Sequence, residues 1–495
     1  MLIRIVTIAA TSLLAMPALA LDGEPGMHDP STILQHDGHF YAFGTGAGLP
    51  FLESADGWQW RRGGTLMSAV PGGKPGPDVL ARGGNNTWAP DVIRMGDRIF
   101  VYYAAPGTQP RAAVGLLVGR SLDPQSPDYK WQDAGAVAWS DGVEDSNAID
   151  PGVFLDPADG RLWLTYGSYF GYIRLVELDP KTGTRLHAAR TPVNIAINSE
   201  ASVIIGHDGW YYLFVTHGSC CAGANSTYNI RVGRARRVSG PYLDNMGVDM
   251  LQGGGRLFAG SRGRHIGPGH FGLLDLGGGV QKFSLHYEAD LDRGGSSVLD
   301  IRPLWWRDGW PVAGDNFVAG TYSIESARTG TVLELATQGT PVGGPRPRGP
   351  TATPAGAAPI ADQQAAQVSA SWASTAIDVR LGPAMLQAQQ KWTISPVAGA
   401  GGYPGSPYFR ICIAGTERAL AATAAGELTA VPAFTGAPEQ LWRIDQLTDG
   451  TYRLMPKSAP GSGESLVLSA VGSSTPTLAK FDPSTDRQRW RIEAP

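Results

Sequence analysis

Three carboxylates occupy similar settings at well-separated points in the chain. Asp29 lies in a His-Asp-Pro motif, Asp150 in an Ile-Asp-Pro motif and Glu200 in a Ser-Glu-Ala motif. Each comes shortly before a segment of strand-forming residues. A single Asp before Pro usually forms a turn, so none of the three is informative alone. Their shared position ahead of a strand is what indicates a common site.

Acids that share one site can divide the work of glycoside hydrolysis. One carboxylic acid protonates the departing oxygen, and a carboxylate on the other face activates water. In inverting enzymes the two groups stand about 6.5–9.5 Å apart to leave room for that water. A third carboxylate can hold the pKa of the acid up by charge repulsion. We therefore interpret Asp29, Asp150 and Glu200 as a candidate catalytic set.

The elements that would bring these acids together are strand segments of one kind. A turn signal precedes each segment, such as Asp37-Gly38 or Asp208-Gly209. Regular repetition of such units is typical of a β-propeller, whose equivalent positions converge on one axis. We predict an all-β, five-bladed β-propeller as the catalytic domain over residues 21–318. The strand segments are 39–45, 98–104, 161–167, 210–216 and 282–288.

A different repeat begins near residue 320. Gln-x-Trp triplets occur at 390–392, 440–442 and 488–490. This threefold pattern resembles the ricin-type β-trefoil, so we expect a β-trefoil-like, carbohydrate-binding domain over residues 319–495. A stretch rich in Pro, Gly and Ala at about 340–367 would be an insertion or a linker. The sugar-binding aspartates of such a module are not evident, so the module would either tether the enzyme to polysaccharide or stabilise it.

Composition restricts the classes of partner. The chain has 66 Gly and 37 Pro among 495 residues, which suits many short strands rather than long helices. A net charge of -4 without a basic tract argues against a nucleic acid or an anionic membrane as partner. Three cysteines are too few for a disulfide framework. The adjacent Cys220 and Cys221 could form a disulfide or remain two buried thiols.

The first twenty residues have the pattern of a cleavable signal peptide. Arg4 precedes an apolar run, and an Ala-Leu-Ala motif ends at Ala20. The apolar run is too short to span a bilayer. We therefore exclude residues 1–20 from the fold and expect a secreted or periplasmic protein.

The order of the motifs resembles one enzyme family. His-Asp-Pro-Ser, Trp-Ala-Pro-Asp, Ile-Asp-Pro and Ser-Glu-Ala, in this order, resemble glycoside hydrolase family 43, the five-bladed propeller arabinanases and xylosidases. Segments 220–234 and 267–272 resemble the endo-1,5-α-L-arabinanase branch in particular. The resemblance covers about residues 22–315. Propeller enzymes that act on fructosides typically have Asn-Asp-Pro near the first acid, which this chain lacks.

The resemblance implies a role for each charged residue. Asp29 would be the general base, Asp150 the modulator of the acid's pKa and Glu200 the general acid. His270 would lie at the floor of the funnel, contacting a calcium or similar ion that is largely coordinated by water. No organic cofactor is implied. Asp91, in Trp-Ala-Pro-Asp, would be structural, accepting bonds at a turn or strand end.

Besides His270, which would lie below the sugar and contact it, four further residues are candidates for contacts with the sugar. Trp88 could stack on the apolar face of a furanose, although simple packing between blades is the alternative. Asn147 and Ser168 could bond sugar hydroxyls, and His28 could line the cleft.

The expected function is hydrolysis of α-1,5-linked arabinofuranosyl chains by a secreted, inverting endo-arabinanase. An exo-acting α-L-arabinofuranosidase or a β-xylosidase on the same scaffold is the alternative within enzymes. A non-catalytic carbohydrate-binding protein is the alternative outside them. The expected partner is arabinan, a pectin side chain, and the expected state is a monomer.

Overall fold

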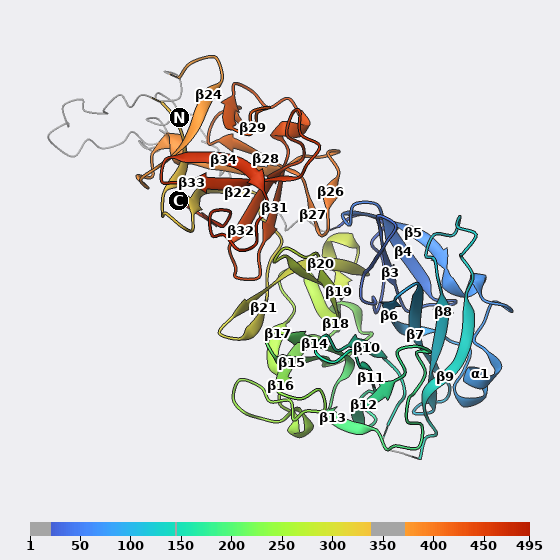
Figure 1. Cartoon of the computed structure of the whole chain (residues 1–495). Helices are drawn as coiled ribbons and strands as arrows, with labels where there is room; N and C mark the ends of the chain where they lie inside the picture. Colours follow the sequence, from blue (N-terminus) through green and yellow to red (C-terminus); the bar gives the residue numbers. More distant parts are fainter. Residues whose placement is uncertain (1–20, 144–145, 338–371) are drawn as a thin grey trace, which may run out of the picture.

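Short turns between strand-forming segments determine the architecture of the first part of the chain. The computed structural model describes residues 21–143, 146–337 and 372–495 (Figure 1). The expected signal peptide at 1–20 and the expected insertion at 340–367 lie outside the described residues. Five separate sheets follow one another, one of five strands and four of four strands. Consecutive strands within each sheet pair antiparallel, as successive hairpins do.

These sheets are the blades of a five-bladed β-propeller, as the sequence predicts. The strand segments recognised in the sequence correspond to β3, β7, β11, β15 and β19, which lie inside their sheets. The strands of the blades are β1 (Asp22–Gly23), β2 (Leu34–His36), β3 (His39–Phe43), β4 (Pro50–Ser54), β5 (Gln59–Thr65); β6 (Trp88–Met95), β7 (Arg98–Pro106), β8 (Ala112–Gly119), β9 (Gln132–Ser140); β10 (Gly152–Leu155), β11 (Leu162–Tyr166), β12 (Tyr172–Leu178), β13 (Val193–Ile197); β14 (Glu200–His207), β15 (Trp210–His217), β16 (Asn229–Ala235), β17 (Arg256–Ala259); β18 (His265–Asp275), β19 (Gln281–Asp290), β20 (Ser296–Arg307) and β21 (Trp310–Ala313).

Separate apolar cores lie between neighbouring blades. One cluster joins blades one and two, and others join two to three, three to four and four to five. A further cluster joins blade five back to blade one. The N-terminal segment reinforces this closure, because β1 pairs with β5 while Leu299 N donates to Pro25 O at 2.8 Å. Side chains from adjacent sheets therefore hold the ring together and fix the axis.

Helical structure is sparse in the described part of the chain. Its α-helix is α1 (Pro77–Arg82), beside β9. No helix there is long and apolar enough to cross a membrane. The 3-10 helices are η1 (Leu66–Ala69), η2 (Gly223–Asn225), η3 (Met250–Gln252), η4 (Leu291–Arg293), η5 (Ala388–Gln390) and η6 (Pro438–Gln440).

The C-terminal part is a closed β-barrel with its own core. Pairings of β22 with β23 and of β28 with β31 close a ring of nine strands in the order β23, β24, β30, β29, β28, β31, β32, β35, β22. The strands are β22 (Gly320–Ser326), β23 (Val332–Leu335), β24 (Ile377–Gly382), β25 (Trp392–Pro396), β26 (Gly402–Tyr403), β27 (Ser406–Pro407), β28 (Phe409–Ile413), β29 (Ala419–Ala422), β30 (Leu428–Val431), β31 (Trp442–Gln446), β32 (Tyr452–Pro456), β33 (Leu466–Val471), β34 (Thr475–Lys480) and β35 (Trp490–Glu493).

Each Gln-x-Trp triplet plays the same structural part in this barrel. The indole nitrogens of Trp392, Trp442 and Trp490 each donate to a leucine carbonyl on an earlier strand, at 2.8–3.0 Å. The paired glutamine side chains accept a backbone N–H from the loop before them, at 2.7–2.9 Å. All three tryptophans are fully buried. The sequence repeat is therefore also a repeat of contacts.

The barrel and the propeller share a bonded interface beside β19 and β20 (Figure 1). Trp306 N donates to Thr448 O at 2.8 Å, and Thr448 N donates to Gly279 O at 2.8 Å. The ammonium group of Lys282, on β19, is buried and donates to Pro404 O in the barrel. The two parts thus contact one another through backbone and a buried charge.

Candidate active site

One residue at the inner start of each blade has a left-handed backbone. The φ angles are 51° at Asp29, 39° at Ala89, 54° at Asp150, 51° at Ala201 and 54° at His270. Non-glycine residues rarely adopt this conformation, and it costs on the order of 1–3 kcal/mol each. In β6, β14 and β18 the pairing register also shifts at this point. Such bulges bend a strand and redirect its side chains.

These equivalent positions meet at the propeller axis. A narrow cavity of about 10 Å³ is lined by one segment from each blade. Two of the predicted site residues, Asp150 and His270, border it directly. The residues that line it are Pro30, Ser31, Thr32, Pro90, Asp91, Asp150, Pro151, Ala201, Ser202, Val203, His270 and Phe271. Signals far apart in the sequence therefore meet in space, as blade geometry requires.

The Asp29 carboxylate is held by three side chains. Its Oδ2 contacts His28 Nδ1 at 2.8 Å and accepts from Thr45 Oγ1 at 2.5 Å. Its Oδ1 lies 2.9 Å from Nε2 of His270. The other nitrogen of His28, Nε2, lies 3.0 Å from Oε1 of Glu288. Because His28 faces a carboxylate at both nitrogens, both nitrogens must carry protons.

Charge at Asp29 is balanced by these imidazoles. Burial alone would raise the pKa of Asp29, but His270 and then His28 hold it well below its ordinary value. Burial would likewise lower the pKa of His28, yet its bonds to Asp29 and Glu288 raise that pKa to about 10. Burial would also lower the pKa of His270, but the Asp29 carboxylate and then the charge of Asp150 raise that pKa to about 9. Asp29 is therefore an ionised carboxylate flanked by two imidazolium groups.

Asp150 and Glu200 form a second pair with the opposite tendency. Asp150 Oδ2 accepts from Ala201 N at 3.1 Å, beside Glu200. Tyr228 donates its hydroxyl to Oε1 of Glu200. Burial raises the pKa of both carboxyl groups, and the charge of Glu200 raises that of Asp150 further. The pair therefore retains a proton at a pH where ordinary carboxylic acids have lost theirs.

The side chains predicted to contact sugar have less free surface for such contacts than the sequence suggests. Asn147 and Ser168 are almost fully buried, and Asn147 Nδ2 donates to Ser168 Oγ at 3.0 Å. Of the two, only Asn147 Oδ1 is a buried polar atom without a partner in the described structure. Trp88 is half-buried and packs against Ile149, so the packing alternative accounts for part of its surface.

Asp91 is structural, as expected. Its two carboxylate oxygens accept backbone N–H groups from neighbouring blades, Thr32 at 3.0 Å and Val153 at 2.9 Å. The carboxylate of the second blade thereby bonds to the first and third blades.

Sequence reasoning missed three side chains of this site. His286 and Glu288 lie on β19, and Tyr228 lies just before β16. The available signal was an i, i+2 pair of titratable residues on a strand that is otherwise buried. The structure also resolves one open alternative, because Cys220 and Cys221 form a disulfide.

The calcium or similar ion expected near His270 would find few side-chain ligands there, so its coordination largely by water stays a prediction. Calcium takes six to eight oxygen ligands, whereas the Nε2 atom of His270 is already engaged with Asp29. Within the described residues, two groups of His, Cys, Asp and Glu could approach one ion, and His270 is in neither. One group includes the sulfurs of the disulfide, which are not thiolates. No chemical step proposed below uses an ion.

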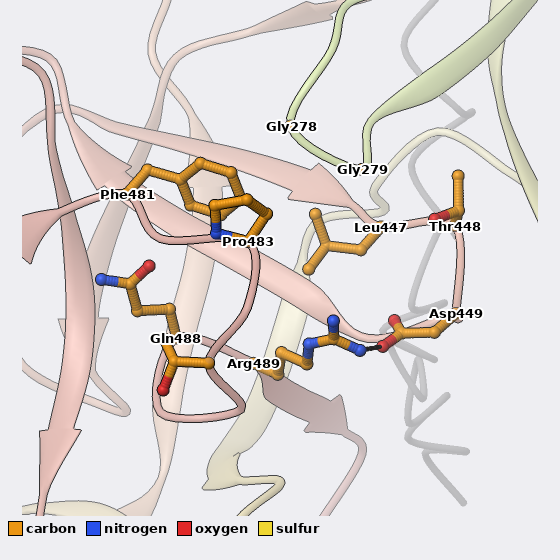
Figure 2. Close-up of a pocket in the computed structure, with 10 residues that line it drawn as sticks. Gly278, Gly279, Leu447, Thr448, Asp449, Phe481, Pro483, Gln488 and Arg489 are labelled. Atoms are coloured by element: carbon orange, nitrogen blue, oxygen red, sulfur yellow. Dashed lines mark hydrogen bonds and ion pairs between the residues drawn. The ribbon is translucent and has the colours of Figure 1, made fainter.

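Two other hollows of the described structure lie outside the axial cavity. One is a cavity of about 50 Å³ between the Gly278–Gly279 turn of the propeller and the barrel. Its lining residues are drawn in Figure 2, where Arg489 pairs with Asp449. None of its lining residues belongs to the candidate site. A wide groove of about 590 Å³ runs beside β16 and β17 and reaches Tyr228.

Comparison with known proteins places this geometry in a family. Residues 24–311 match the description of glycosyl hydrolases family 43. The extracellular exo-alpha-(1->5)-L-arabinofuranosidase ArbA of Cellvibrio japonicus is 32% identical over 301 residues, 58% of this chain and 85% of that protein. The extracellular endo-alpha-(1->5)-L-arabinanase 1 of Bacillus subtilis is 32% identical over 294 residues, 58% of this chain and 87% of that protein.

A solved structure agrees with the sequence comparison. The crystal structure of an exo-1,5-alpha-L-arabinanase from a bovine ruminal metagenomic library is 35% identical, with a TM-score of 0.52. The similarity covers 60% of this chain and 99% of that one. The propeller, its axial acids and a family match over more than half of the sequence lead to one conclusion: the chain belongs to glycosyl hydrolases family 43 and is a glycoside hydrolase.

Proposed function

We propose that this glycoside hydrolase cleaves α-1,5-L-arabinofuranosyl linkages in arabinan with inversion of configuration. The observation that carries the proposal is the division of charge among three axial carboxylates. Asp29 is held ionised between two imidazolium groups, whereas Asp150 and Glu200 together retain a proton. The relatives named above, which act on α-1,5-arabinosides by name, support the choice of substrate.

In the proposed reaction each acid has one task. Asp29 accepts a proton from a water molecule as the water oxygen attacks the anomeric carbon. Glu200 donates its proton to the glycosidic oxygen as the bond to the leaving sugar breaks. The water thus becomes the new anomeric hydroxyl, and the two protons end on Asp29 and on the leaving group. Deprotonation of Asp29 and protonation of Glu200 by solvent restore the enzyme.

Contacts around Glu200 suit this task. Tyr228 occupies Oε1, so the proton to be donated resides on Oε2. Asp150 would keep the pKa of Glu200 raised through charge repulsion, as expected of a modulator. Asp150 is itself held by the amide of Ala201, which fixes it next to the acid.

Release of reducing sugar from linear arabinan tests the proposal. The wild-type protein should release arabinose-containing products, and the Glu200→Gln protein, prepared in the same way, should not. Short oligosaccharides of several lengths at early times indicate endo action, whereas a single small product indicates the exo alternative. Release from xylo-oligosaccharides and not from arabinan would replace the proposal with a β-xylosidase. Binding of sugar without any hydrolysis would favour the non-catalytic alternative.

We propose further that the C-terminal barrel is a ricin-type β-trefoil. The threefold repetition of Trp indole and Gln side-chain contacts supports this, as does the ring β22, β25, β28, β31, β32, β35 with three flanking hairpins. The proposed domain boundary is at residues 318/319. Co-sedimentation of the full-length Glu200→Gln protein with insoluble arabinan would test whether the protein binds the polymer, and comparison with residues 21–318 would assign that binding.

Export is also part of the proposal. The signal-peptide pattern of residues 1–20 and the extracellular labels of both relatives support it. N-terminal sequencing of the protein recovered from its native host should begin at Leu21. A chain that retains Met1 would contradict export by this route.

A further inference from the structure

Glu288 is a buried carboxylate to which the proposed chemistry assigns no role. It lies on β19, and its side chain is only 2% exposed. Oε1 accepts from Nε2 of His28 at 3.0 Å and from Nε2 of His286 at 3.3 Å. Oε2 accepts from the backbone N–H of Cys221 at 2.8 Å. Three donors from three separate segments therefore converge on one carboxylate.

Both histidines extend from Glu288 to Asp29. His28 contacts the Asp29 carboxylate through Nδ1, at 2.8 Å from Oδ2. His286 accepts the backbone N–H of Asp29 at its own Nδ1, at 2.9 Å. The two rings stack with centroids 4.4 Å apart. Each histidine thus bridges Glu288 and Asp29. His28 reaches the side chain of Asp29, and His286 reaches its backbone.

Hydrogen-bond direction shows why a carboxylate is needed at position 288. A backbone N–H can only donate, so Nδ1 of His286 carries no proton and its single proton resides on Nε2. That proton, the Nε2 proton of His28 and the Cys221 amide all point at Glu288. An ionised carboxylate accepts at every site, whereas a side-chain amide would present its own N–H groups to some of these donors.

Resting on the function proposed above, we propose that Glu288 is a positioning residue for hydrolysis: through His28 and His286 it fixes the orientation of Asp29 toward the attacking water. Glu288 does not touch the substrate. Its effect is on the geometry of the base, for which small misplacements are costly in enzymes.

The loop that anchors Glu288 also serves the acid. Cys221, whose amide binds Glu288, is bonded to Cys220, and Tyr228 in the same loop donates to Glu200. One loop therefore contacts the support of the base at one end and the acid at the other. The loop thereby links the position of the proposed base, Asp29, to that of the proposed acid, Glu200.

Substitution of Glu288 by Gln in the full-length protein tests the proposal. We expect kcat on arabinan to fall by about tenfold or more. Loss of a side chain that orients a metal ligand lowers activity on this scale in metal enzymes, and Glu288 would orient Asp29 in the same indirect way. The KM should stay close to that of the wild type, because Glu288 does not contact sugar. Glu334→Gln is the matched control, since Glu334 is a buried carboxylate in the barrel that bonds Arg380 and Gln390. It should leave kcat unchanged.

Proton NMR of the resting protein provides a readout that does not depend on turnover. The Nε2 protons of His28 and His286, bonded to Glu288, should give downfield signals that change in Glu288→Gln and persist in Glu334→Gln. Unchanged signals, or unchanged kcat with changed signals, would overturn the positioning role. If Glu288→Gln does not fold, Glu288→Asp keeps the charge but withdraws the oxygens, and the same kcat loss and signal change are required of it.

The two proposals fail in distinguishable ways. A wild-type protein that hydrolyses a different glycoside would refute the proposed substrate, and the Glu288 variants would then be assayed on that glycoside. A wild-type protein active on arabinan whose Glu288→Gln variant loses affinity, with kcat intact, would refute the positioning role alone.

Discussion

The hydroxyl of Tyr228 donates a hydrogen bond to Oε1 of Glu200, and Asp150 lies beside the same carboxyl group, held by the amide of Ala201. Burial raises the pKa of Glu200 and the hydrogen bond from Tyr228 lowers it, while Asp150, as the proposed modulator, would raise it further. A donor stabilises the ionised form and lowers the pKa, whereas a nearby negative charge raises it. The pH at which the proposed acid Glu200 loses its proton therefore depends on both the Tyr228 donor and the Asp150 charge.

That balance predicts opposite shifts for two substitutions. The general acid works while protonated, so activity is lost as the pH rises through its pKa. Tyr228→Phe removes the donor and should move the alkaline limb of kcat to higher pH. Asp150→Asn removes the charge and should move it to lower pH. Rates on arabino-oligosaccharides across the pH range measure the alkaline limb of each variant, and shifts in the same direction would contradict these assignments.

Removal of either reacting carboxyl group should abolish turnover while the fold persists. Glu200→Gln and Asp29→Asn preserve size but not proton transfer, and general acid–base groups contribute about 10²–10⁴-fold each. Circular dichroism and thermal unfolding check the fold, and initial rates on arabinan check activity. More than about a tenth of the wild-type rate in either variant would exclude the assignment, given that range.

The stereochemistry of the first product reports on the mechanism. Inversion at an α-linked arabinofuranoside gives the β-anomer before mutarotation. Proton NMR of a fresh hydrolysate should show that anomer first. Early appearance of the α-anomer would instead mean retention, with the two carboxyl groups about 5–5.5 Å apart.

Residues 21–318 should hydrolyse short oligosaccharides without the barrel, because the axial acids and their partners all lie in the propeller. The turnover number on these substrates should match that of the whole protein. The melting temperature should fall, since the contacts of Trp306 and Lys282 with the barrel are lost. An insoluble or inactive fragment would show that the shared interface is required for folding.

Lys282 should make stability depend on pH at the interface. Burial lowers the pKa of its ammonium group to about 8, against about 10.4 in an unfolded chain. Below pH 8 the folded protein bears the full penalty of a buried charge, and between pH 8 and about 10.4 the penalty fades. The melting temperature of the wild type should therefore rise relative to Lys282→Met as the pH increases from 7 to 10. A constant difference between the two proteins would contradict a lowered pKa.

Local sequence predicted the blades because turn signals and strand-forming residues are local properties. The strands β3, β7, β11, β15 and β19 were recognisable without any tertiary information. Asp29, Asp150 and Glu200 stood out because each precedes such a strand in the same way. Their convergence on one site followed from blade geometry, because equivalent positions in the blades of a propeller meet at its axis.

Partners contributed by other blades could not be read from the sequence. Glu288 is separated from His28 by 260 residues, and nothing in its own strand indicates that contact. Tyr228 is closer in the sequence, 28 residues from Glu200 and in the same blade, but its contact with that carboxyl group depends on how the loop before β16 folds back. The buried position of Lys282 depends on the barrel, so a strand viewed alone would place that charge in solvent.

The left-handed residue that begins each blade has a consequence for how such sites change. Three of the blades place a candidate site residue on it, namely Asp29, Asp150 and His270, and the fourth blade places Glu200 one residue earlier. In the second blade the equivalent residue is Ala89, which has no chemistry of its own. The same backbone conformation thus recurs five times around one axis, and in two blades, at Ala89 and Ala201, an alanine occupies it. New reactivity can arise there by exchanging a single side chain, without altering the architecture that aims it.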